Sequence, residues 1–157
     1  MGVEQDYEKA AACYKLAAEQ GHAESQYELG SCYENGNGVP EDIEEAAKWY
    51  IKAAEQGNDE AQYSLALFYD EGNGVSQDSK KAVFWYTKAA EQGNGDAQFN
   101  LALCYENGEG VRQDYAKAAF WYKKSAEQGD SSAQYNLGCL YENGNGVPQS
   151  IDKAIEW

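Results

Sequence analysis

Apolar and polar residues alternate along the whole chain with the period of an α-helix. Within residues 58–72, apolar side chains stand at i, i+4, i+7 and i+8, and residues 78–92 repeat this spacing. The two stripes consist of Ala61, Leu65, Phe68 and Tyr69, followed by Ala82, Trp85, Tyr86, Ala89 and Ala90. Each stripe predicts a helix with one buried face. Strand patterns are absent, so the predicted fold class is all-α.

Each predicted helix has a start signal and a stop signal. Asn58 and Asp78 are suitable N-caps, and Gly72 and Gly93 end the two helices because glycine accepts the left-handed conformation. The linker between them, 72–77, holds one apolar residue. The same cap positions recur at Asn94 and Asp130 for first helices, and at Asp6, Asp42, Asp114 and Ser150 for second helices. The pattern therefore predicts a helix-turn-helix unit.

This unit returns every 36 residues without insertion, in a frame that begins at Gln26, Gln62, Gln98 and Gln134. A fixed period of this length predicts a stack in which each unit buries its apolar face only against its neighbours. Short alanines allow close helix approach, and Trp85 with its three copies is expected to fill the gaps between layers. We predict one domain over 1–157: a partial repeat 1–21, complete repeats 22–57, 58–93 and 94–129, and a truncated repeat 130–157.

The chain is strongly acidic, with 27 acidic and 12 basic residues and a net charge of −15. Nucleic acids and anionic membranes attract clustered Lys and Arg, so this balance argues against both as partners. The charge indicates a solvated surface in the first place, and a basic partner as the alternative. No apolar run is long enough to span a bilayer, and the start lacks a signal peptide.

Four cysteines do not recur as pairs. Cys32 and Cys104 share one repeat position, which separates them by more than a disulfide can bridge, whereas Cys13 and Cys32 could bridge. We favour reduced, buried thiols and a cytoplasmic location for this segment. Because the sequence begins inside a repeat and stops within a helix, we expect it to come from a longer array.

Short motifs that could signal chemistry are better explained by helix ends. Gly36-Asn37-Gly38 follows a helix rather than a strand, and Ser150 to Lys153 spells S-x-x-K at a cap position. His22, the only histidine, also occupies a cap position, and the loop 70–78 lacks alternating oxygen ligands for calcium. We therefore predict no catalytic, cofactor or metal site.

A glutamate recurs in the last turn of each second helix, where the helix dipole disfavours negative charge. Two explanations remain open: shared duplication history, or a contact between each glutamate and the start of the next helix. The residues are Glu19, Glu55, Glu91 and Glu127.

The repeated pattern A-x-x-x-L-A/G-x-x-Y-x-x-G-x-G-V-x-x-D-x-x-K-A-x-x-W-Y-x-K-A-A-E-x-G resembles the Sel-1-like repeat, a relative of the tetratricopeptide repeat. This sequence departs from the pattern at three positions, where Cys13 replaces tryptophan, Glu45 replaces lysine and Ser150 replaces aspartate. The resemblance implies an α/α right-handed superhelical solenoid that acts as a non-catalytic scaffold or adaptor for proteins. Alternatives are an immunity-type inhibitor and a structural segment that stacks on itself through its uncapped ends. A β-lactam hydrolase-like enzyme is disfavoured, because such relatives carry regularly paired cysteines.

In this family the first helices line the concave face, where residues that differ between repeats are candidates for partner binding. The resemblance implies a groove with an apolar centre and a polar rim, suited to an extended peptide or a helix with basic residues. The candidates are Glu28, Ser31, Asn35, Ser64, Leu67, Glu71, Asn100, Leu103, Asn107, Asn136 and Asn143. Alternatively, the two leucines support helix packing.

A second candidate surface lies on the second helices. Phe84 and Phe120 directly precede core tryptophans, which turns them about 100° around the helix toward solvent. They stand one repeat apart, so we consider them an alternative, convex partner-binding site.

Overall fold

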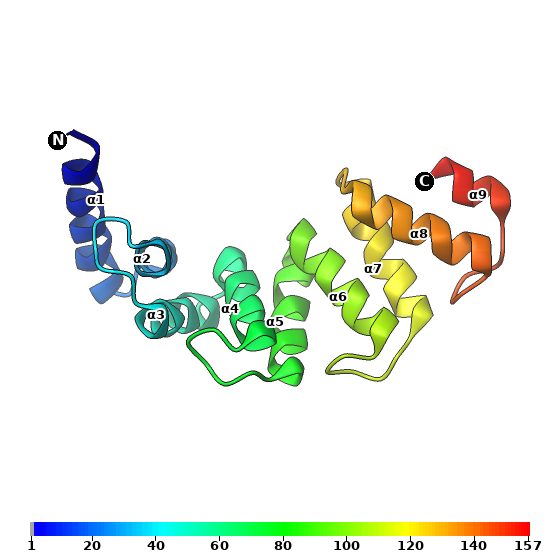
Figure 1. Ribbon diagram of the computed structural model, residues 1–157, viewed down its shortest axis with the longest axis horizontal. Coiled ribbons are helices and arrows are strands. Elements are labelled where there is room, and N and C mark those ends of the chain that lie inside the picture. Colours follow the sequence, from blue (N-terminus) through cyan, green and yellow to red (C-terminus); the bar gives the residue numbers. More distant parts are fainter. Residues whose placement is uncertain (1) are drawn as a thin grey trace. The chain divides into compact units, whose positions relative to one another are not determined.

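The structure is a computed structural model that describes the backbone of residues 2–157 and the side chains from residue 6 onward; Met1, where the first partial repeat was predicted to begin, lies outside the described residues. Over this range the chain forms nine helices and no strands (Figure 1). They are α1 (Gly2–Glu19), α2 (Ala23–Asn35), α3 (Ile43–Glu55), α4 (Asp59–Glu71), α5 (Ser79–Gln92), α6 (Gly95–Asn107), α7 (Tyr115–Glu127), α8 (Ser131–Asn143) and α9 (Ile151–Glu156). The all-α prediction is confirmed.

The chain divides into two compact units, residues 1–78 and 79–157. In the first unit α1, α2, α3 and α4 pack in chain order, each against the next, and in the second unit α5 to α9 do the same. Helices α2, α4, α6 and α8 are the first helices of the predicted repeats, and α3, α5, α7 and α9 are second helices. Neighbours in sequence are therefore neighbours in space, as a repeat stack requires.

The predicted caps explain most helix boundaries. Asn58 and Asn94 each accept a hydrogen bond from the backbone N–H three residues later, and Gly72 ends α4 in the left-handed conformation. Asp42, Asp114 and Ser150 cap second helices in the same way. The prediction for Asp6 is wrong: α1 begins at Gly2, so helical backbone already precedes this residue and leaves no free helix start to cap.

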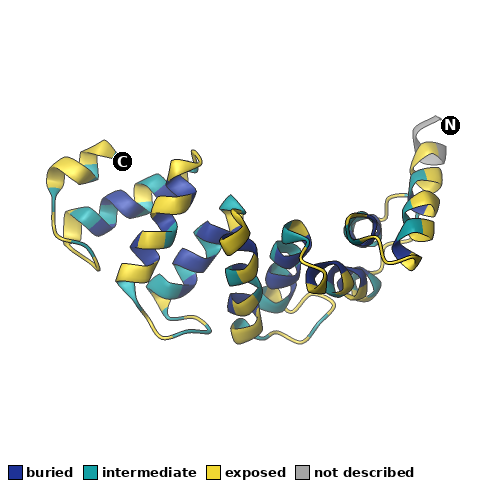
Figure 2. Cartoon of the chain, turned by 180° about the vertical axis from the view of Figure 1, so that it is seen from behind, coloured by how far each residue is buried: buried dark blue, intermediate teal, exposed yellow. Residues whose placement is uncertain are grey.

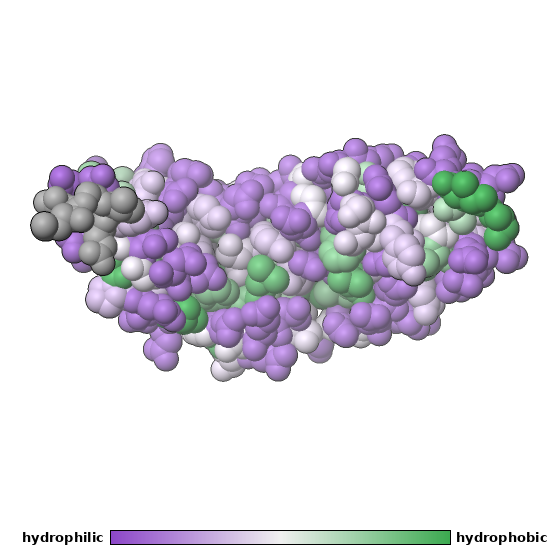
Figure 3. Space-filling model, turned by 45° about the horizontal axis from the view of Figure 1, so that its top comes forward, coloured by the Kyte–Doolittle hydropathy of each residue, from purple (hydrophilic) through white to green (hydrophobic). Residues whose placement is uncertain are grey.

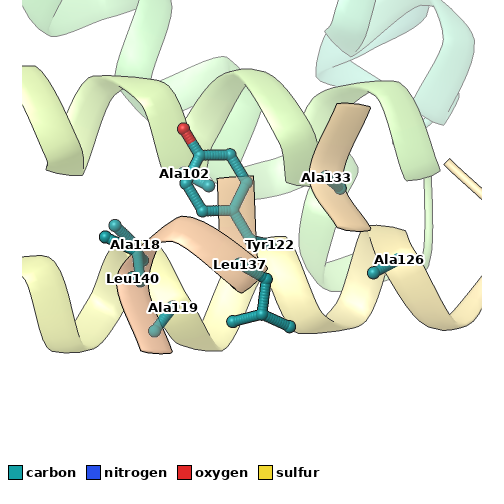
Figure 4. Close-up of a cluster of buried hydrophobic side chains, with 8 residues drawn as sticks. All are labelled: Ala102, Ala118, Ala119, Tyr122, Ala126, Ala133, Leu137 and Leu140. Atoms are coloured by element: carbon teal, nitrogen blue, oxygen red, sulfur yellow. The ribbon is translucent and has the colours of Figure 1, made fainter. Parts of the chain in front are cut away.

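The core of each unit, dark blue in Figure 2, is built mainly from alanines and leucines, with one buried tyrosine on each of α3, α5 and α7. Tyr122 is fully buried and reaches from α7 toward Ala102 on α6 (Figure 4). At the equivalent contact in the first unit, a Cβ atom on Gly30 would lie 2.7 Å from Cε1 of Tyr50, so this helix pair meets at a position with no side chain. A small residue on the first helix thus sets the distance to the tyrosine ring.

The expected role of the tryptophans is confirmed only in part. Trp49 is buried, with 7% of its surface exposed, but Trp85, Trp121 and Trp157 are half-buried. Tyrosines of the second helices take the fully buried positions between helices. In α5 and α7 each tryptophan instead packs edge-on against the exposed phenylalanine that precedes it. The tryptophans there lie at the margin of the core.

A buried glutamine joins the ends of consecutive helices. Gln98 of α6 donates from Nε2 to the carbonyl oxygen of Ala90 in α5 at 3.1 Å, and its Oε1 accepts a hydrogen bond from Gln128 at 2.9 Å. In the first unit Gln26 donates to Ala18 at 3.0 Å and accepts from Gln56 at 2.6 Å. One amide therefore connects two second helices through the first helix between them.

The residue after the recurring glutamate, Gln56 or Gln128, makes a contact across repeats, and this contact is with the preceding first helix rather than with the start of the next one. Glu19, Glu55, Glu91 and Glu127 are all exposed, and Glu127 lies 3.7 Å from Lys123 of its own helix. Gln128, the next residue, reaches across to Gln98 and to the carbonyl oxygen of Gly93. The contact across repeats is thus made by an uncharged side chain, while the glutamates stay exposed in the last turn of the helix.

Each loop between the two helices of a repeat lies against the start of the preceding second helix. Gly110 has φ +67°, and a Cβ atom there would overlap the carbonyl group of Ser79 at the start of α5. Gly146 approaches Tyr115 of α7 in the same way. The second glycine of each G-x-G linker is therefore required by close backbone approach, in addition to its positive φ.

We expect Gly110→Ala to lower the free energy of unfolding by about 1–3 kcal/mol more than Gly129→Ala, measured by urea denaturation. Both glycines have positive φ, but no atom lies within 4 Å of a Cβ added at Gly129. The two substitutions share the backbone strain and differ in overlap. Equal losses of stability would show that the loop does not depend on this contact.

Candidate interaction surface

The candidate residues of the first unit lie along α2 and α4. We call this surface the first-helix face of the unit: Glu28, Ser31 and Asn35 on α2, with Ser64, Leu67 and Glu71 on α4. Asn35 and Glu71 are exposed, and the other four are half-buried. A hydrogen bond of 2.9 Å from Asn58 to Glu24 links the start of α4 to the start of α2.

In the second unit the first-helix face is formed by Asn100, Leu103 and Asn107 on α6, and by Asn136 and Asn143 on α8. Asn107 and Asn143 are exposed. Leu103 is half-buried and packs against the core cluster around Tyr122. This leucine therefore has a packing role, as the alternative explanation proposed, while part of its surface remains accessible.

Buried tyrosines place their hydroxyl groups beside this face. The hydroxyl of Tyr50 donates to Oε2 of Glu34, and that of Tyr122 donates to Oε2 of Glu106, each at 2.5 Å. Burial, and then the carboxylate, raise the pKa of both tyrosines far above the ordinary value, while hydrogen bonding to Ser31 and to Asn136 respectively acts in the opposite direction. Ser31 in the first unit and Asn136 in the second, both predicted surface residues, therefore lie beside a buried tyrosine hydroxyl group.

The Tyr–Glu pairs were missed by the sequence analysis. The signal available was the fixed spacing of 16 residues between Glu34 and Tyr50, which recurs between Glu106 and Tyr122. Two other candidates hydrogen-bond within their own helix, because Asn35 donates to the carbonyl oxygen of Ser31 and Asn143 to that of Cys139, both at 2.9 Å. These amides keep their oxygen atoms available as acceptors.

The two units differ sharply in charge. Residues 1–78 contain 17 acidic and 4 basic side chains, whereas residues 79–157 contain 10 and 8. On the first-helix face this difference appears as carboxylates in the first unit and amides in the second. Burial raises the pKa of Tyr27, and so do the nearby carboxylates of Glu60, Glu28, Glu34 and Glu24. The first unit therefore presents the more negative face.

The second helices expose the two predicted phenylalanines. Phe84 and Phe120 are each 53% exposed, which confirms their orientation toward solvent. Elsewhere, Figure 3 shows a face that is mostly hydrophilic with apolar residues in small patches, including α9, where Ile151 and Ile155 are exposed.

The histidine, the cysteines and the acidic side chains were also located in the part of the chain that the structure describes. His22 accepts a hydrogen bond from the backbone N–H of Ser25, as its cap position predicts. No group of three His, Cys, Asp or Glu side chains that could hold a metal ion was found among the described residues. All four cysteines are free thiols; Cys32 and Cys104 are buried as predicted, whereas Cys13 is exposed and Cys139 is half-buried. No described helix is both long and apolar enough to cross a membrane.

Together, the helix pairs, the cross-repeat glutamines and the variable exposed face define a helical-repeat protein of the solenoid class. The sequence model of the Sel1 repeat family matches five consecutive segments that together cover the chain: residues 1–22, 23–58, 59–94, 95–130 and 131–157. The protein belongs to the Sel1 repeat family, whose members are generally non-catalytic scaffolds for protein interaction.

Solved structures agree with this assignment. A protective antigen of uropathogenic Escherichia coli with an SLR fold is 43% identical, with a TM-score of 0.89 over 94% of this chain and 32% of its own. A Sel1 repeat protein from Oxalobacter formigenes is 34% identical, with a TM-score of 0.87 over 98% of this chain and 65% of its own. Helicobacter pylori cysteine rich protein B is 25% identical, with a TM-score of 0.66 over 83% and 94%. The chain thus spans about a third of the first protein and under two thirds of the second. No curated protein matches it in sequence.

We expect Tyr122→Phe to lower the free energy of unfolding by about 1–2 kcal/mol near neutral pH, because Glu106 loses its donor. The raised pKa of Tyr122 in the folded protein makes this contribution complete below the pKa of the unfolded chain, about 10, and progressively weaker above it. Urea denaturation at neutral and at alkaline pH should therefore show the difference between variant and wild type shrinking above about pH 10. A difference that grows with pH would contradict this assignment.

Proposed function

We propose that this chain is a non-catalytic scaffold that binds a peptide or protein segment through the first-helix faces. The main support is the separation of roles on the first helices. Leu65 and Leu101 are fully buried in the stack, whereas Asn35, Glu71, Asn107 and Asn143 stand exposed on the adjacent stripe. Residues outside the stacking contacts are free to differ between repeats, and a scaffold needs such positions for specificity.

The chemistry of the two faces favours a polar partner with basic residues. In the first unit Glu28 and Glu71 supply carboxylates, which pair with Lys or Arg side chains. In the second unit the amides of Asn107 and Asn143 can exchange hydrogen bonds with an extended backbone. Leu67 and Leu103 add limited apolar surface between these polar groups. We therefore propose that the first-helix face of residues 1–78 binds a segment with basic residues.

The proposal can be tested by photo-crosslinking in lysate of the native host. A benzophenone amino acid placed at Asn35 or at Asn107 should give a crosslinked protein that excess unlabelled chain competes away. Glu55 provides the matched control, because it is exposed at the end of α3, away from the candidate stripe. The same product obtained equally from Glu55, or only from Glu55, would contradict binding at the first-helix face.

The charge of the partner gives a second prediction. For the captured partner, Glu28→Lys combined with Glu71→Lys should weaken binding by about tenfold or more, and added salt should reduce the difference. Fluorescence anisotropy with the purified partner measures the affinity. The control is Glu55→Lys, which makes the same change of charge at one exposed site outside the first-helix face. Unchanged affinity in the double variant, with the crosslinks retained, would show that the site lies there but does not select basic residues.

A further inference from the structure

The second unit repeats one surface arrangement on two helices. Phe84 on α5 and Phe120 on α7 are both 53% exposed, and each packs edge-on against the following tryptophan with 4.9 Å between ring centroids. In both helices a lysine one turn later, Lys88 or Lys124, lies with Nζ 5.8 Å from the phenylalanine ring. The tryptophans therefore hold two exposed rings in matching positions, each with a cation beside it.

Stacking of repeats does not require phenylalanine at this position. The equivalent residues are Ala12 in α1, Lys48 in α3 and Glu156 in α9, all of them exposed. These helices pack against their neighbours without an aromatic ring there. Two exposed phenylalanines one repeat apart thus add apolar surface that the fold does not use, which is the mark of an interaction site.

The cations beside the rings are available to a partner. Lys88 and Lys124 are exposed, and in the described part of the chain neither forms a salt bridge. On α3, by contrast, Lys48 lies 2.8 Å from Glu45. Residues 79–157 also hold eight of the twelve basic residues of the chain. This face therefore combines apolar rings with unpaired positive charge in an otherwise acidic protein.

A hollow of about 310 Å³ adjoins Phe120. It is lined by Phe120, Trp121 and Lys124 of α7, by Ala90, Glu91, Gln92 and Gly93 at the end of α5, and by Gln98, so its lining holds one acidic and one basic side chain. A single leucine or phenylalanine side chain fits a space of this size, with its neighbours in the partner placed beside Lys124. The surface beside Phe120 is therefore concave and can enclose a side chain of the partner, which a flat patch cannot do.

We propose that Phe84, Lys88, Phe120 and Lys124 form a second docking surface, which we call the Phe–Lys face, and that it binds an acidic segment with apolar anchors. The lysines select carboxylates, and the phenylalanines and the hollow select the anchors. Phe84 and Phe120 stand one repeat apart, so two apolar anchors in one segment can each contact one ring. This site is independent of the first-helix face and prefers partners of opposite charge.

The probe is a fluorescein-labelled helical peptide with leucines at i and i+7 and glutamates on the flanking positions. Two control peptides replace the leucines by serine or the glutamates by lysine. Fluorescence anisotropy should show saturable binding of the acidic leucine peptide at low salt, and at least tenfold weaker binding of both controls. Binding of the lysine peptide as tight as that of the acidic one would overturn the proposed charge preference.

Variants locate the site on the protein. Phe84→Ser with Phe120→Ser should weaken binding of the acidic peptide at least tenfold, and Lys88→Gln with Lys124→Gln should remove most of its salt dependence. Tyr135→Ser is the matched control, because this tyrosine is 72% exposed but lies outside the Phe–Lys face. Circular dichroism and urea denaturation check that each variant is folded; exposed side chains should be removable without unfolding.

Three results would overturn the proposal. The first is that anisotropy shows no saturable binding of the acidic peptide, and the second is that the phenylalanine variant binds this peptide as tightly as wild type does. A mass in light scattering that rises with protein concentration, and falls to the monomer in the phenylalanine variant, would show that a second copy of the chain covers this face instead. Crosslinking from Asn35 and Asn107 should be unaffected by these variants, so failure here and failure of the first-helix proposal are distinguishable.

Discussion

The stack depends on one interaction, made by the buried glutamine of the first helices α2, α4 and α6. A helix end leaves carbonyl groups without partners, and in a stack these ends are covered by the next repeat. Gln98 donates a hydrogen bond to the buried carbonyl oxygen of Ala90 and accepts one from Gln128. One side chain thus provides a partner for a buried polar group and fixes the register of α5, α6 and α7. Gln26 does the same between Ala18 and Gln56. Apolar packing supplies the driving force, and the glutamine supplies the alignment.

As a result of this alignment, each helix has some positions that pack between helices and others that are exposed to solvent. Alanine, glycine and tyrosine positions control how closely helices approach, as Gly30 against Tyr50 illustrates. The exposed stripes do not control the distance between helices, and they carry different residues in the two units. The first unit carries most of the negative charge, while the second carries amides on its first helices and the Phe–Lys face on its second helices. One repeat can thus present two chemically distinct surfaces without altering its core.

The sequence was sufficient for the repeat, the helices and most caps, because periodicity and capping are local properties. It failed at Asp6, where the helix extends beyond the expected start, and at Trp85, where the tyrosine one position on takes the buried site. The Tyr122–Glu106 pair and the partners of Gln98 could not be predicted, since a recurring polar residue reveals its period but not the group it meets. The exposure of Phe120 was predicted; the hollow beside it depends on three helices and was not.

The most direct test of this account is the stability of Gln98→Met, measured by urea denaturation. Methionine keeps the length of the side chain but cannot replace either hydrogen bond, so the buried carbonyl oxygen of Ala90 loses its partner and the exposed Gln128 loses one of its two acceptors. We predict a loss of about 1–3 kcal/mol. Gln113→Met is the control, because Gln113 is exposed and bonds within its own repeat, to Glu106 at 2.7 Å; it should cost less than about 1 kcal/mol. Equal stability of Gln98→Met and wild type would contradict the role assigned to the buried glutamine.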